Sequence, residues 1–155
     1  MKLRINWGRM VRLKKTRDAT SYHLDLAKVT AGAGVYIFGR KWHTQFEALY
    51  VGKAGNIRSR VKGHLDRVRL MRHLRDAKDG NRIVLAGNIA LRPGQKQGKC
   101  LLLAEKALIR HFLSEGDDLA NKMGTKIQRH ELESSGRHPK RFFPKTIYLE
   151  RSKGG

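Results

Sequence analysis

Short runs of apolar residues bounded by turn residues predict four β-strands. Glycines at 32 and 34 lead into the first run, and the second run ends at Gly52. The connection between these two runs is short, which predicts an antiparallel hairpin. The four expected strands cover residues 35–38, 46–51, 83–91 and 146–149, of which 83–91 is either one strand or a broken pair of strands, 83–85 and 89–91.

A second set of apolar residues recurs at helical spacing and predicts two helices. From Ile57 to Met71 the apolar positions form one stripe, and the other faces carry many arginines, so we expect one basic amphipathic helix between Asn56 and Asp79. Residues 99–113 form the most apolar helix. The polar stretch 117–136 reads as irregular chain with a short helix. The order of elements predicts an α/β or α+β sandwich around a small, mainly antiparallel sheet.

Charge is the strongest compositional signal. The chain of 155 residues has 34 Lys and Arg against 13 Asp and Glu, a formal net charge of +21. A single small domain with this charge repels itself unless its working partner is a polyanion. Nucleic acid fits, because neutralised phosphates release counterions and drive binding. On composition alone, a non-catalytic binder of RNA, the ribosome or DNA ranks ahead of an enzyme.

Other features of the composition bear on the compartment. Cys100 is the one cysteine, which excludes an intramolecular disulfide framework and fits a reducing environment. No apolar run is long enough to span a bilayer, and the basic N-terminus has no apolar segment behind it. We therefore expect a cytoplasmic protein without a membrane partner.

Glu105 occupies an unusual place in the apolar helix. It lies four residues after Leu101 and four before Ile109, in the middle of the apolar stripe. An unpaired carboxylate is costly in such surroundings and needs a cation. The cation is either an arginine in a structural ion pair or a metal ion.

Four further residues have chemistry but little specificity when taken singly. Arg60 and His64 are four residues apart on one helix face, where such a pair is most often solvated. Tyr36 and Tyr50 lie in the expected hairpin, where tyrosines usually pack. Gly52 ends the second strand and allows a ligand to approach the backbone.

Together these residues resemble the GIY-YIG endonuclease family. Gly34-Val35-Tyr36 is similar to its first motif and Tyr50-Val51-Gly52 to its second, and residues 50–57 are similar to the nuclease half of UvrC-type repair proteins. The family's arginine, histidine, metal-binding glutamate and asparagine match Arg60, His64, Glu105 and Asn121. The resemblance covers residues 32–123. It leaves residues 1–31 as a basic N-terminal extension and residues 124–155 as a C-terminal extension with a closing strand.

The resemblance implies a fold, a metal and a reaction. The fold is a three-stranded antiparallel sheet flanked by helices. The metal is one Mg²⁺ or Mn²⁺ with Glu105 as its protein ligand. Water attacks the phosphorus in line, Tyr36 acts as general base with His64 as the alternative, Tyr50 assists, and Arg60 stabilises phosphate charge. Further contacts to nucleic acid are expected from Gly52, Lys53, Arg58, Lys62 and Arg67.

The expected substrate is DNA, whether duplex, branched or single-stranded. With one active site per chain, duplex cleavage requires a homodimer or sequential nicking. The alternative to the nuclease is the non-catalytic basic nucleic-acid binder. It predicts salt-sensitive binding without cleavage, and it gives no reason for a carboxylate on the apolar stripe.

Overall fold

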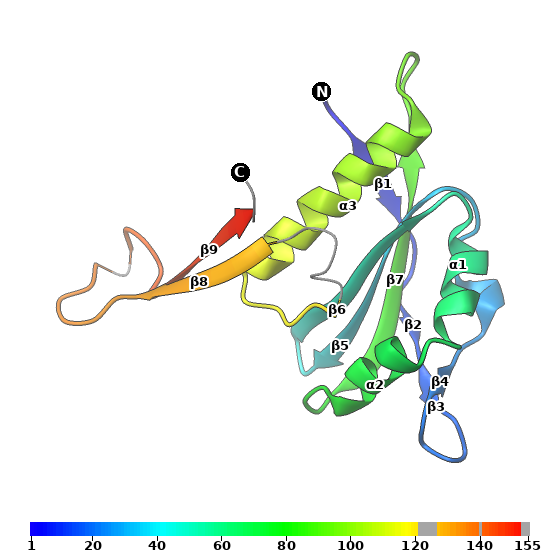
Figure 1. Cartoon of the computed structure of the whole chain (residues 1–155), viewed down its shortest axis with the longest axis horizontal. Helices are drawn as coiled ribbons and strands as arrows, with labels where there is room; N and C mark the ends of the chain where they lie inside the picture. The colour runs from blue at the N-terminus through cyan, green and yellow to red at the C-terminus, as the bar shows by residue number, and fades with distance from the viewer. Residues whose placement is uncertain (121–126, 140, 153–155) are drawn as a thin grey trace.

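The computed structural model describes residues 1–120, 127–139 and 141–152, and its centre is an antiparallel β-sheet. The sheet order is β1-β7-β5-β6, so the chain's first long strand lies between the other two (Figure 1). The three long strands are β5 (Gly34–Trp42), β6 (Gln45–Ala54) and β7 (Asn81–Ala90). The predicted mixed architecture with an antiparallel hairpin is confirmed.

The N-terminal segment belongs to this sheet. Strand β1 (Arg4–Trp7) and strand β2 (Val11–Arg12) both pair antiparallel with β7, which gives five strands. The expectation of three strands was therefore wrong. Each added strand is too short to show a clear alternating pattern, and pairing with β7 satisfies its backbone groups. A small hairpin of β3 (Lys14–Lys15) and β4 (Tyr22–His23) follows, and then the 3₁₀ turn η1 (Leu26–Lys28).

The expected single basic helix is two helices. Helix α1 (Ile57–His64) begins at Asn56, whose side chain accepts a hydrogen bond from the Ser59 N–H at 3.2 Å, a regular N-cap. Residues 65–67 then interrupt the helix, and α2 (Val68–Asp76) follows. The break rotates the apolar stripe. Val68, which one continuous helix would bury, is 69% exposed, while Leu70 and Leu74 are buried.

Helices cover both faces of the sheet. Tyr36 and Phe38 on β5 point to the face packed by α1 and α2. Ile37, between them, points to the opposite face, where it meets Ile109 and Leu113 of α3 (Gln97–Ser114). Alternate residues of one strand therefore contribute to two cores. Most contacts of α3 with the sheet fall on β6, the edge strand.

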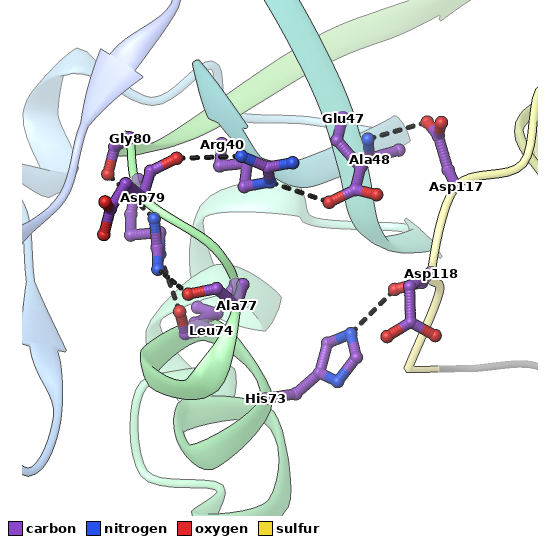
Figure 2. A network of polar contacts seen from close by, with 11 residues as sticks. Arg40, Glu47, Ala48, His73, Leu74, Ala77, Asp79, Gly80, Asp117 and Asp118 are labelled. Atoms are coloured by element: carbon purple, nitrogen blue, oxygen red, sulfur yellow. Dashed lines mark hydrogen bonds and ion pairs between the residues drawn. The ribbon is translucent and has the colours of Figure 1, made fainter. Parts of the chain in front are cut away.

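A polar network holds the outer edge of β6 (Figure 2). Arg40 donates to the Glu47 carboxylate and to the Asp79 carbonyl, each at 2.8 Å. The Asp117 carboxylate, just beyond α3, accepts the Ala48 N–H at 2.8 Å, beside a bulge in β5–β6 pairing. The Ala120 N–H donates to the Leu49 carbonyl at 2.8 Å. The segment after α3 is thereby fixed alongside β6.

The C-terminal part forms a separate hairpin beyond α3 (Figure 1). Strand β8 (Ile127–Glu133) pairs antiparallel with β9 (Thr146–Ser152) in a two-stranded sheet. The strand expected over 146–149 is present, but it pairs with β8 and does not close the central sheet. The expectation of irregular chain through 136 missed β8. Among the described residues, no helix is both long and apolar enough to cross a bilayer.

Candidate active site

Tyr36 and Gly52 are cross-strand partners, and the tyrosine ring lies over the glycine. They pair in the β5–β6 register. A Cβ placed on Gly52 would lie 2.3 Å from the Tyr36 hydroxyl oxygen, a severe overlap. A glycine is required here so that the ring can lie flat against the strand. We expected a ligand to approach the backbone at Gly52, but the ring of Tyr36 fills that space.

The Tyr36 hydroxyl is hydrogen-bonded to His64. Its oxygen lies 2.6 Å from His64 Nε2, and the two side chains are 1% exposed each. Tyr50 completes the group: its ring centroid is 4.9 Å from that of His64 and 6.4 Å from that of Tyr36, with which it is stacked. The reading of His64 as part of a solvated Arg–His pair is therefore wrong. It is a core residue at the end of α1.

Burial keeps this cluster uncharged. It raises the pKa of Tyr36 well above its ordinary value, and the nearby Tyr50 adds to the rise while Arg60 opposes it. Burial also raises the pKa of Tyr50. For His64, burial and the charges of Arg67 and Arg60 lower the pKa to about 4. At neutral pH the cluster consists of two phenols and a neutral imidazole.

The surroundings of the phenol favour one direction for its hydrogen bond with His64. A guanidinium has only donors, so the contact between Arg60 and the Tyr36 hydroxyl is one in which the oxygen accepts. We infer that the phenol donates its proton to Nε2, the acceptor 2.6 Å away, which leaves the hydrogen of His64 on Nδ1. Nδ1 is buried and has no hydrogen-bond partner in the described part of the chain.

Glu105 lies within electrostatic reach of both tyrosines, since its charge raises the pKa of Tyr36 and of Tyr50. Its own pKa is raised by burial, against the charge of Lys53, a backbone hydrogen bond from Lys53 and the charge of Arg60. Among the residues that the structure describes, its carboxylate forms no ion pair. The alternative of a structural salt bridge between Glu105 and an arginine therefore has no support among the described residues.

A hollow of about 500 Å³ opens beside these groups. It lies between the end of β6, the N-terminus of α1 and the start of α3. Arg60 and Lys53 line it, as does Leu101, one helical turn before Glu105. Its lining also includes Ala54, Gly55, Asn56, Ser59 and Gly98. The hollow is basic and open, which suits a phosphate diester.

The donor set fits a hard divalent cation held mainly by water. No group of three or more His, Cys, Asp or Glu side chains that could hold a metal occurs in residues 1–120, 127–139 and 141–152. Mg²⁺ commonly binds through one or two carboxylates and retains several waters. A half-buried carboxylate without an ion pair, next to an open hollow, is compatible with that form of binding.

Comparisons with protein-family models, curated proteins and solved structures found no match. The functional assignment therefore depends on the geometry of the site and on the motif resemblance.

The structure places the remaining predicted residues in different roles. Arg58 donates twice to the Val29 carbonyl, at 2.9 and 3.1 Å, and so holds the N-terminal segment against α1. Lys62 and Arg67 are exposed, and their contacts to phosphate stay a prediction. Asn121 lies outside the described residues. Ala120, immediately before it, is fixed beside Leu49.

Sequence reasoning missed a second group of residues next to the cluster. Val68, Arg69 and Leu70 line another hollow with Tyr50 and His64. The signal was the position of Val68 between two arginines, which marks a break in the apolar stripe. Under the expectation of one continuous helix, Val68 was assigned to the core.

Proposed function

We propose that this protein is a metal-dependent endonuclease that hydrolyses DNA phosphodiester bonds by in-line attack of water. The single observation that carries the proposal is the position of Arg60, which lines the basic hollow and also lies beside the Tyr36–His64 hydrogen bond, with Glu105 nearby and free of any ion pair to the described residues. These groups come from β5, α1 and α3. A fold that only bound nucleic acid would not need a buried phenol–imidazole pair beside a carboxylate.

Tyr36 and His64 act together as the base. Burial makes a Tyr36 phenolate unfavourable, so Tyr36 is a neutral phenol before the reaction begins. As Tyr36 accepts a proton from the attacking water, its own proton moves along the 2.6 Å hydrogen bond to His64 Nε2. The imidazole becomes imidazolium and the phenol is regenerated. In this relay Tyr36 accepts the proton from water and His64 is its final acceptor, so both residues share the role of general base.

Arg60 and Lys53 neutralise the phosphate. Both line the hollow, and a guanidinium can hold two phosphate oxygens at once. Their charge counters the negative charge that grows on the phosphoryl oxygens during attack. Glu105 would hold Mg²⁺ or Mn²⁺, which would supply further charge neutralisation for the leaving oxygen. Tyr50 stacks on Tyr36 and keeps the relay rigid.

A non-catalytic nucleic-acid binder is the second candidate, and the net charge of +21 favours it. Such a protein would bind DNA or RNA with strong salt dependence, would leave both intact, and would not respond to divalent ions. The half-buried Glu105 has no role in it.

The two candidates separate in one cleavage experiment. Supercoiled plasmid and labelled single-stranded, duplex, flap and junction DNA are incubated with the full chain in Mg²⁺, Mn²⁺ or EDTA. We expect metal-dependent products that Glu105→Gln reduces by roughly 100-fold or more. Glu115→Gln, exposed at the end of the same helix, is the matched control and should cut normally. Intact substrates throughout, or full activity of Glu105→Gln, would exclude the nuclease.

A further inference from the structure

A second hollow adjoins the tyrosine–histidine cluster beside the start of α2. It has a volume of about 460 Å³ and lies between β6, the end of α1 and the start of α2. Tyr50 and His64 form its inner wall, Val68 and Leu70 add an apolar wall, and Ala120 borders it. Arg67 and Arg69, both exposed, stand at its rim. The hollow is thus apolar inside and cationic at the entrance.

His64 Nδ1 is the feature that indicates a ligand. The side chain is 1% exposed, it lines the hollow, and no described group satisfies Nδ1. With the phenol proton donated to Nε2, Nδ1 is an N–H donor. A buried donor without an acceptor is unfavourable, and such groups in folded proteins usually have a partner or a function. A ligand with an acceptor atom could supply the partner.

The walls restrict the chemistry of that ligand. Val68 is 69% exposed, and its apolar surface beside the ring of Tyr50 suits a flat apolar or aromatic group. Val68 and Leu70 offer no hydrogen-bond donors, so the apolar wall of the hollow favours an apolar body over a free phosphate. Two arginines at the rim suit phosphates attached to that group. A ligand with a flat ring, a hydrogen-bond acceptor on the edge of that ring and attached phosphates is a nucleotide.

We propose that this hollow binds one nucleobase of the DNA substrate, with an acceptor on the edge of the base facing His64 Nδ1. Arg67 and Arg69 contact the phosphates on either side of that nucleotide. The inference rests on the proposed nuclease function and specifies its substrate. A base within a duplex must leave the stack to enter such a hollow. The substrate is therefore DNA with an unpaired nucleotide next to the scissile phosphate, as in a single strand, a flap or a junction.

Occupancy of the hollow also assists the relay. When His64 accepts the proton from Tyr36, an acceptor on Nδ1–H stabilises the imidazolium that forms. The bound nucleobase thus orients the imidazole ring of His64, which takes up the proton. A substrate lacking the base should then lose turnover rate as well as affinity.

Binding is tested without cleavage. The histidine ring signals of the full chain are followed by NMR while thymidine monophosphate is added, with His64 assigned from the His64→Gln variant. We expect the His64 signals to shift with thymidine monophosphate and to stay in place with 2-deoxyribose 5-phosphate. Val68→Trp fills the hollow from an exposed position and should abolish the shift. Leu91→Trp adds the same side chain at a remote exposed site and should preserve it. A shift of equal size with the abasic sugar phosphate, or one that survives Val68→Trp, would overturn the proposal.

Cleavage gives an independent readout. Single-stranded oligonucleotides are compared with copies that carry an abasic residue at each position around the cut. One abasic position should reduce kcat at least 10-fold in wild type, and the difference should vanish in Val68→Trp. Normal cleavage of every abasic substrate would refute the base subsite and leave the nuclease standing. Thymidine monophosphate binding by a protein that cuts nothing would refute the nuclease and leave the subsite standing.

Discussion

The Tyr36 hydroxyl lies 2.6 Å from His64 Nε2, in a cluster that is almost closed to solvent. Two neutral groups joined by one hydrogen bond beside Arg60, which lines the basic hollow, can pass a proton between them without creating a buried phenolate. Tyr36→Phe tests this relation. We expect activity to fall roughly 10²–10⁴-fold, the usual range for loss of a general acid–base group, with the ring still packed over Gly52. Steady-state cleavage of a single-stranded oligonucleotide measures the loss.

Tyr22→Phe is the matched control for that change. The Tyr22 side chain is also buried, but its hydroxyl has no hydrogen-bond partner in the described part of the chain. Removal of an unsatisfied hydroxyl should leave activity unchanged and stability equal or slightly higher. Tyr36→Phe leaves His64 Nε2 unsatisfied and should lower the free energy of unfolding by about 1–3 kcal/mol. Equal effects of the two substitutions on cleavage would contradict a special role for Tyr36.

The acid limb of stability provides a second prediction. His64 in the unfolded chain takes up a proton below its ordinary pKa of 6.5, whereas in the folded protein it does so only near about 4. Between these values the unfolded state binds more protons, so stability decreases as the pH is lowered from about 6.5 to about 4. The contribution is fully present above pH 6.5.

Denaturant unfolding measured at several pH values checks the sign. His64→Gln removes the titrating group, so the difference in unfolding free energy between wild type and variant should shrink as the pH falls through this window. A difference that grows toward acid pH would mean that folding raises the pKa of His64 rather than lowering it.

Gly52 provides a third prediction, because its lack of a Cβ makes room for the Tyr36 ring. Gly52→Ala should displace that ring, lower the free energy of unfolding by about 1–3 kcal/mol as overpacking does, and reduce cleavage. Gly63→Ala in α1 is the control, since nothing lies within 4 Å of a Cβ built there. Thermal unfolding should show it equal to wild type or more stable by up to about 1 kcal/mol. If Gly52→Ala changed neither stability nor cleavage, the ring of Tyr36 could not lie over Gly52 as described.

The sequence predicted the parts of the site that depend on local pattern. Three features follow from residues that are close together in the chain. They are the β5–β6 hairpin, the N-cap of α1 at Asn56, and the position of Glu105 on the apolar stripe of α3. What it missed depends on long-range packing. The burial of His64 needs the ring of Tyr36, 28 residues away, as a partner. The exposure of Val68 needs the break after α1, which no glycine or proline at residues 65–67 announces.

The same limit explains the sheet. β1 and β2 form only because β7 presents free backbone groups on the side away from β5, and a segment of two to four residues has too few positions to show that from its own pattern. Gly87, opposite Trp7 in this pairing, has no room for a side chain beside Ile5 and Trp7. Such a match between a glycine and a distant strand becomes visible only after the register is known.

Metal binding at Glu105 gives a prediction that does not require cleavage. If the carboxylate holds Mg²⁺ or Mn²⁺ in the folded state only, added metal should raise the melting temperature as RT ln(1 + [M]/Kd) increases. Glu105→Gln should abolish this response, while Glu115→Gln should retain it. Because burial already raises the pKa of Glu105, the variant without metal should be as stable as wild type or more stable. A metal response that Glu105→Gln leaves intact would assign the ion to another place and remove the carboxylate from the reaction.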